Sequence, residues 1–167
     1  PPRSTLFPYT TLFRSAGITD TFTITPLDVL DEAALASAVS ILEAAFNDPE
    51  RYGKARILSQ LQPADLPFYR RFFVARRAGE VVGIGGVKAA DWASDTHILY
   101  LSAVAEHARG QGIARALINA RIAWVMETFG SGRLLVSTAR SRRFARLGFR
   151  LMGKREAGGR RLMLLEF

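Results

Sequence analysis

The segment most suggestive of chemistry in this chain is Arg109-Gly110-Gln111-Gly112-Ile113-Ala114. An apolar stretch with a strand pattern precedes this turn, and the amphipathic stretch Gly112 to Thr128, with a helical period, follows it. Backbone N–H groups at a helix start have no intrahelical partner, and glycines let a ligand approach them closely. Together with the positive end of the helix dipole, these groups favour a phosphate. The turn therefore predicts a site for a phosphate-bearing ligand, because Arg-Gly-x-Gly is more than a plain helix cap requires.

A second glycine cluster, Gly83-Ile84-Gly85-Gly86, does not meet the requirements of such a site. It lies inside the strand pattern Glu80 to Ala89, and no helix follows it to supply a free N-terminus. Glycines within a strand more often mark a bulge or a close approach to the backbone. We therefore expect a structural role for this cluster.

The chain has 167 residues, no cysteine and a formal charge of +8. The absence of cysteine excludes a disulfide framework, a thiolate metal site and a cysteine nucleophile. No apolar run approaches the roughly 18 residues that a membrane span requires. The surplus of arginine could attract nucleic acid or surround an anionic cofactor, and its concentration near the glycine turn favours the cofactor. We expect a cytoplasmic protein that binds no nucleic acid, membrane or metal.

The first fifteen residues require a separate interpretation. Thr5 to Ser15, TLFPYTTLFRS, resembles the translation of a common sequencing-library adapter over all eleven residues. A signal peptide is the weaker alternative, because the stretch has no continuous apolar core. We therefore expect residues 1–15 to be an adapter-derived, non-native segment and residues 16–167 to form the domain. Without Arg3 and Arg14 the formal charge falls from +8 to +6.

Strand and helix patterns then alternate along one domain with no linker. Ala78-Gly79 separates two strand patterns and predicts a hairpin turn. The expected strands are Thr21 to Pro26, Arg71 to Arg77, Glu80 to Ala89, Thr96 to Ala105, Arg133 to Thr138, Gly148 to Lys154 and Arg160 to Phe167. The expected helices are one with Asp31 and Glu32 in its first turn that ends at Phe46, and others over Glu50 to Gln62, Gly112 to Thr128 and Ser141 to Leu147. The order β-α-α-β-β-β-α-β-α-β-β predicts a mixed α/β (α+β) fold.

This order, with a phosphate loop after the fourth strand, resembles the GCN5-related N-acetyltransferase (GNAT) family. The likeness extends over residues 20–167. Arg109, Gly112 and Ala114 match the family motif Arg/Gln-x-x-Gly-x-Gly/Ala, and Phe144 to Phe149 resembles its Tyr-x-x-x-Gly-Phe ending. The resemblance implies a mostly antiparallel central sheet with helices on both faces.

The resemblance also implies that acetyl-coenzyme A binds in a V-shaped gap between the fourth and fifth expected strands. The amides of Gly110 to Ala114 would hold the pyrophosphate, with Arg115 close to the phosphates. The exposed edge at Ser102 to Val104 would pair with the pantetheine arm, as an added strand would. The implied cofactor-binding residues are Ser102, Ala103, Val104, Arg109, Gly110, Gln111, Gly112, Ile113, Ala114, Arg115 and Ser137.

Amine acetylation needs a base for the substrate ammonium and often an acid for the departing thiolate. Many family members place a tyrosine as that acid where this chain has Phe144, which has no proton to give but would pack well in a core. His97 is a candidate base because of its ordinary pKa, and a solvated histidine at a strand end is the alternative. Tyr100 is a second candidate, with core packing or a pantetheine contact as alternatives. Its alternation with Leu99 and Leu101 predicts the sheet face opposite to theirs.

Other charged residues also have two interpretations each. Glu43, Asp48 and Glu50 lie on the helical segment that borders the acceptor pocket in this family, and they are either candidate bases or a solvated face. A water relay is a further route for the proton. Four arginines could reach the 3′-phosphate of coenzyme A or form a solvated basic face: Arg140, Arg142, Arg143 and Arg146.

Two functions follow from the resemblance. The first is an N-acetyltransferase that moves the acetyl group of acetyl-coenzyme A directly to a primary amine, on a small molecule or a protein, within a ternary complex. The second is a catalytically weakened acyl-coenzyme A sensor of the same fold, which Phe144 favours. A homodimer is compatible with the sequence, which does not fix the oligomeric state.

Overall fold

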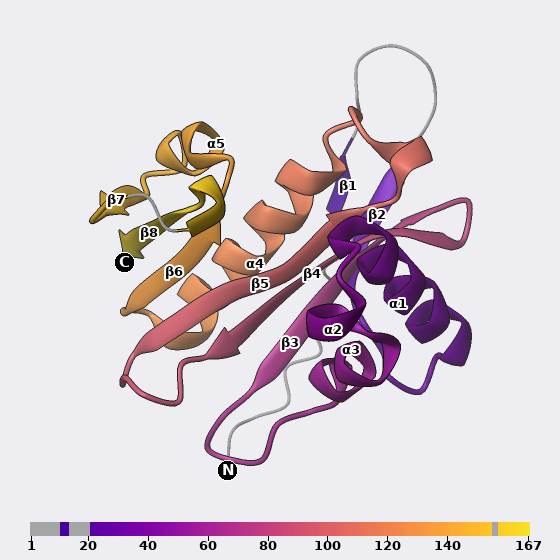
Figure 1. Cartoon of the computed structure of the whole chain (residues 1–167), viewed down its shortest axis with the longest axis horizontal. Coiled ribbons are helices and arrows are strands. Elements are labelled where there is room, and N and C mark those ends of the chain that lie inside the picture. Colours follow the sequence, from indigo (N-terminus) through magenta and orange to yellow (C-terminus); the bar gives the residue numbers. More distant parts are fainter. Residues whose placement is uncertain (1–10, 14–20, 155–156) are drawn as a thin grey trace.

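Eight strands form one mixed sheet in the computed structural model, which describes residues 11–13, 21–154 and 157–167 (Figure 1). The strands are β1 (Thr11–Phe13), β2 (Phe22–Pro26), β3 (Arg70–Arg77), β4 (Glu80–Ala89), β5 (Thr96–Val104), β6 (Arg133–Thr138), β7 (Arg150–Met152) and β8 (Arg161–Glu166). Their order in the sheet is β1-β2-β3-β4-β5-β6-β8-β7. Strands β5 and β6 run parallel, and all other neighbours are antiparallel.

Helices cover both faces of this sheet, as the sequence predicts (Figure 1). They are α1 (Glu32–Phe46), α2 (Pro49–Tyr52), α3 (Lys54–Leu61), α4 (Ile113–Phe129) and α5 (Ser141–Ala145), with short 3₁₀ turns η1 (Glu106–Ala108) and η2 (Ala157–Gly159). Helices α1 and α3 pack on one face through Ala38, Leu42 and Ile57. Helix α4 packs on the other face through Leu117 and Val125. None of the helices in the described ranges is long and apolar enough to cross a membrane.

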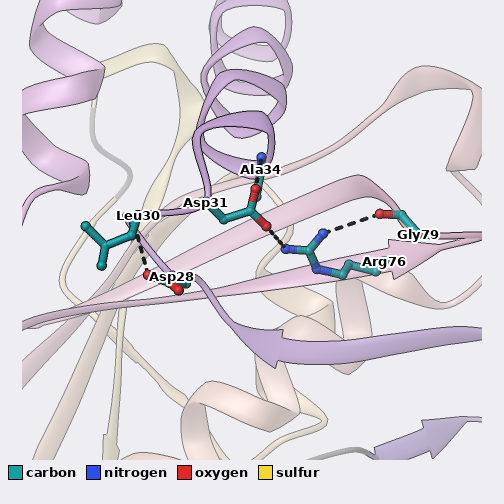
Figure 2. A network of polar contacts seen from close by, with 6 residues as sticks. All are labelled: Asp28, Leu30, Asp31, Ala34, Arg76 and Gly79. Carbon is teal, nitrogen blue, oxygen red and sulfur yellow. Dashed lines mark hydrogen bonds and ion pairs between the residues drawn. The ribbon is translucent and has the colours of Figure 1, made fainter.

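A polar network fixes the start of α1 against the β3–β4 hairpin. Asp31 accepts a hydrogen bond from the Ala34 N–H at 2.9 Å and forms an ion pair with Arg76 at 2.8 Å (Figure 2). Arg76 also donates to the Gly79 carbonyl at 3.3 Å. The Ala34 N–H and then the Arg76 guanidinium hold the pKa of the Asp31 carboxyl below its ordinary value. The cap therefore ties the first helix to the turn that joins two central strands.

The hairpin at Ala78-Gly79 is confirmed. Arg77 pairs with Glu80, which leaves a two-residue loop, and both loop residues have positive φ, 49° and 83°. This is the geometry that matches the right-handed twist of the flanking strands. The predicted strand Arg133 to Thr138 is also found with the same bounds.

The helix expected over Glu50 to Gln62 is instead two helices, α2 and α3. Gly53 interrupts it with an extended backbone, ψ 158°. A side chain at Gly53 would meet the Pro49 carbonyl oxygen at 2.7 Å. The chain therefore turns closely on itself at this glycine, and the turn brings Tyr52 and Arg56 to the same side of the sheet.

Residues 1–15 lie largely outside the described part of the chain. Thr11–Phe13 is described, and it forms β1, an edge strand that was not expected from the sequence and pairs antiparallel with β2. Main-chain hydrogen bonds to an open sheet edge do not depend on side-chain identity. The pairing of β1 with β2 therefore does not test where this segment comes from, and its adapter origin stays a prediction.

Candidate functional site

The parallel strands β5 and β6 separate part-way along their length. Their pairing runs from Thr96 opposite Arg133 to Leu99 opposite Val136. Beyond this point β5 continues to Val104 and β6 to Thr138 without pairing to each other. The edge of β5 that faces β6 is therefore open at Ser102, Ala103 and Val104, which are exposed or half-buried.

The end of this open edge leads directly into the glycine turn before α4. Gly110 and Gly112 have φ of +77° and +83°, and no heavy atom lies within 4 Å of where a Cβ would stand on either. No side chain in the described part of the chain caps α4 at Gly112. The N–H groups of Ile113, Ala114 and Arg115 thus have neither an intrahelical partner nor a side-chain cap, and the helix dipole favours an anion there.

Side chains hold the turn in this position. Arg109 Nε donates to the Val104 carbonyl at 3.2 Å, which ties the turn to the end of β5. Arg77 Nη1 on β3 donates to Gln111 Oε1 at 2.7 Å. At the other strand, Ser137 receives hydrogen bonds from Arg160 at both its hydroxyl and its carbonyl. The predicted cofactor-binding residues therefore lie along the open edge of β5, on the turn and at the end of β6.

A bulge changes the direction of side chains at this point of β5. The register between β4 and β5 shifts between Ile84 and Gly86, and Leu101 has a positive φ of 45°. Tyr100 and Leu101 consequently pack into the same hydrophobic cluster beneath α1 and α3, whereas Leu99 packs on the α4 face. The expectation that Tyr100 lies opposite Leu101 is wrong, because the extra residue of a bulge interrupts the alternation.

A cavity of about 170 Å³ lies between α2, α3, β4 and β5. It is lined by Tyr52, Arg56, Ile57, Gln60, Lys88, Tyr100 and Leu101. The Tyr100 hydroxyl is buried and has no hydrogen-bond partner among the described residues. Burial raises the pKa of the Tyr100 phenol, although the nearby Arg70 opposes this shift. Tyr100 therefore lines this cavity with its phenol protonated and its hydroxyl buried.

A larger cavity of about 370 Å³ shares Lys88 with the first. Its walls include the α3–β3 connection and the β4–β5 loop, with Phe68, Trp92 and the acids Asp65 and Asp91. Lys88 Nζ lies 4.8 Å from the centre of the Tyr100 ring. Lys88 and Arg56 were not predicted from the sequence, because a basic residue in a strand or helix carries no motif that reveals which cavity it lines.

His97 lies elsewhere in the molecule. Its side chain is 4% exposed, so the alternative of a solvated strand-end histidine is wrong. It packs in an aromatic cluster with Phe129, at 4.3 Å between ring centres, and its Nδ1 is 2.7 Å from the Tyr69 hydroxyl. His97 lines neither cavity. Burial lowers the pKa of His97, and the nearby Asp95 opposes this only in part.

This burial predicts a pH-dependent stability. The folded-state pKa of His97 lies below the unfolded value of about 6.5, so the unfolded chain takes up a proton first as the pH falls. The free energy of unfolding should therefore decrease below about pH 6.5 until the folded-state pKa is passed. Urea unfolding at a series of pH values would show a smaller decrease for His97→Gln than for the wild type. His107→Gln, at the exposed second histidine, is the matched control; an equal change in both variants would contradict the assignment.

The acidic candidates are also separate from the cavities. Glu43 and Glu50 are exposed on α1 and α2, and Asp48 accepts a hydrogen bond from the Arg51 N–H as the N-cap of α2. None of the three lines either cavity. Within the described ranges, no three histidine or acidic side chains gather as metal ligands would.

Phe144 on α5 packs in the core, as expected. It is 6% exposed and contacts Phe149 edge-to-face, with 5.3 Å between ring centres. On the same helix, Arg142 is exposed and Arg143 is half-buried. The aromatic ring at position 144 thus supports the sheet beside β6 and offers no proton.

The strand glycines have the structural role expected of them. A side chain at Gly86 would meet the Phe72 ring at 2.5 Å, and one at Gly85 would meet the Arg121 guanidinium carbon at 2.8 Å. Arg121 on α4 is 1% exposed and donates to the carbonyls of Leu117 and Gly86, both at 2.9 Å. Gly85 therefore provides the space in which a buried guanidinium lies against the sheet.

Comparison with known proteins agrees with this geometry. Residues 36–149 match the model of the Acetyltransferase (GNAT) family. No curated relative matches the chain.

Three solved structures have a similar fold. An aminoglycoside 6′-acetyltransferase type Ii is 18% identical, with a TM-score of 0.69 over 86% of this chain and 96% of its own. The ribosomal-protein-S18-alanine N-acetyltransferase of Escherichia coli is 20% identical, with a TM-score of 0.66 over 87% and 93%. The PaiA N-acetyltransferase of Thermoplasma acidophilum, in complex with coenzyme A, is 12% identical, with a TM-score of 0.64 over 87% and 99%.

The family match spans most of the chain, and it includes the separated strands, the glycine turn and the Gly148-Phe149 ending. The chain belongs to the GNAT family of acetyltransferases.

Proposed function

We propose that this protein is an N-acetyltransferase that transfers the acetyl group of acetyl-coenzyme A to a primary amine. The observation that carries the proposal is the open edge of β5 ending in an uncapped helix N-terminus. The amides at Gly110 to Ala114 would hold the pyrophosphate, with Arg115 nearby. The Ser102 to Val104 edge would pair with the pantetheine arm.

The proposed reaction is direct transfer within a ternary complex. The amine nitrogen attacks the thioester carbonyl, a C–N bond forms, and the C–S bond breaks. The amine proton leaves to water, because no histidine or carboxylate lines the smaller cavity to accept it. We propose that Tyr100, rather than the residue at position 144, donates a proton to the departing thiolate.

The sensor is the second candidate function, and the buried Phe144 favours it. A thiol-release assay with acetyl-coenzyme A and a panel of amines separates the two functions. Release that depends on an amine supports transfer. Binding of coenzyme A without release for any amine would replace the enzyme with the sensor.

Substitution of Gly112 tests the cofactor site itself. Gly112→Ala forces a side chain into a backbone conformation that costs roughly 1–2 kcal/mol, and relief of this strain would turn the free amides away. We expect the affinity for coenzyme A, measured by calorimetry, to fall about tenfold. Gly79→Ala is the matched control, because Gly79 also has φ +83° and open space but lies in a hairpin loop. Equal affinities for the two variants would contradict the site.

The acceptor class and the location of the protein are also proposals. The aminoglycoside enzyme acts on a small molecule and the S18-alanine enzyme on a protein, so both acceptor types are known on this fold. We propose a cytoplasmic location, in keeping with the cysteine-free sequence.

A further inference from the structure

The smaller cavity is unusually basic for a site that must accept an amine. Lys88 and Arg56 line it, and no acidic side chain does. Within the described residues neither of the two has an ion-pair partner. A free amine is a cation at neutral pH, so this cavity repels an acceptor that carries only positive charge.

The position of these cations restricts what they can contact. Lys88 Nζ is held over the Tyr100 ring, and the Arg70 guanidinium donates to the Ser59 carbonyl at 3.0 Å on the adjoining wall. Arg70 also lies close enough to act on the pKa of Tyr100. Two cations, Lys88 and Arg56, thus line the smaller cavity, while Arg70, Asp65 and Asp91 line the larger one.

The size of the smaller cavity adds a second restriction. Its volume is about 170 Å³, less than half that of the larger cavity of about 370 Å³. It admits a small head group, and Lys88 also lines the larger cavity.

We infer that the acceptor is a primary amine that carries an anionic group, a carboxylate or a phosphate, within a few bonds of its nitrogen. This inference rests on the proposed function. Lys88 and Arg56 bind the anion by charge-assisted hydrogen bonds. Their charge also favours loss of the ammonium proton, which the nucleophile requires. A polycation, such as an aminoglycoside, is excluded by the same charges.

The test compares acceptors that differ only in the anion. L-alanine is compared with L-alaninamide, L-phenylalanine with L-phenylalaninamide, and phosphoethanolamine with ethanolamine, in the thiol-release assay. We expect kcat/KM to be about 10- to 100-fold higher for at least one anionic member than for its neutral partner. An amide lowers the pKa of its amine, so preference for the acid runs against intrinsic reactivity. A preference within the alanine or phenylalanine pair indicates a carboxylate, and a preference within the ethanolamine pair indicates a phosphate.

Variants assign the preference to the two side chains. Lys88→Gln and Arg56→Gln should each lower the ratio of kcat/KM for the anionic amine to that for its neutral partner about tenfold. Lys54→Gln is the matched control, because Lys54 is exposed on the same helix as Arg56 and lines neither cavity. Equal or faster turnover of neutral or cationic amines would overturn the inference and leave the proposed transfer intact.

Calorimetry keeps the inference testable if no amine is acetylated. The same amines are titrated into the protein saturated with coenzyme A. Binding of an anionic amine that is lost in Lys88→Gln would support the anion site while the transfer proposal fails. No binding of any anionic amine, together with no turnover, would overturn both.

Discussion

Tyr100→Phe is expected to lower kcat about 100-fold, the usual contribution of one positioned proton donor. Tyr100 lines the smaller cavity, and its hydroxyl is buried with no partner among the described residues. Burial raises the pKa of this phenol, so the hydroxyl carries its proton before the thiolate departs. Because the hydroxyl stabilises nothing in the folded protein, the thermal midpoint should stay the same or rise.

Steady-state kinetics and thermal unfolding of the same preparation test this prediction. A fall in kcat with an unchanged KM for acetyl-coenzyme A separates proton donation from binding. Tyr52 is the alternative donor, since it lines the same cavity from α2 and stacks on Phe46 with 4.4 Å between ring centres. A large loss of kcat in Tyr52→Phe and none in Tyr100→Phe would transfer the role to Tyr52.

Gly85→Ala is expected to lower the free energy of unfolding by about 3–5 kcal/mol, as the loss of partners around a buried charge does. The added methyl group would stand 2.8 Å from the guanidinium carbon of Arg121. To avoid this contact the guanidinium must leave the Gly86 carbonyl, to which it donates at 2.9 Å. Burial already lowers the pKa of Arg121 to about 9, so the cation depends on these carbonyls.

A double-mutant cycle measured by urea unfolding isolates this mechanism. Arg121→Met fills similar volume without a charge, so Gly85→Ala should cost at least about 2 kcal/mol less in that background. Gly83→Ala is the control in the same strand. Its methyl group would meet the ends of the Ile113 and Leu117 side chains at 3.1 and 3.2 Å, and these can move; a loss of about 1 kcal/mol is expected. The same large cost of Gly85→Ala with Met at position 121 would contradict the role of the guanidinium.

Local patterns in the sequence predicted most of the elements. Hydrophobic periodicity predicted α1, α4 and every strand except β1, and Ala78-Gly79 predicted the hairpin. These predictions are confirmed because each depends on neighbours within about ten residues, where the spacing of apolar side chains and the turn chemistry act directly. The split into α2 and α3 was missed, because it depends on the approach of Gly53 to the Pro49 carbonyl.

The cofactor side of the site could also be predicted from sequence, because one continuous segment builds it. The open strand edge, the glycine turn and the helix N-terminus follow one another from Ser102 to Arg115. Its chemistry comes from backbone amides, and their exposure follows from glycine and from helix geometry. The proposal that the ligand is acetyl-coenzyme A comes from the family resemblance, which the family match supports.

The acceptor side was decided by tertiary structure alone. Arg56, Lys88 and Tyr100 come from α3, β4 and β5, and no spacing in the sequence indicates that they line one cavity. The bulge at Leu101 turns Tyr100 and Leu101 to one side, whereas simple alternation separates them. Burial of His97 in an aromatic cluster likewise required packing of β5 against α4. The sequence by itself determined most of the elements and the glycine turn, because both arise from short-range backbone physics. The charge of the smaller cavity and the place of the proposed proton donor depend on side chains that only the folded sheet brings together.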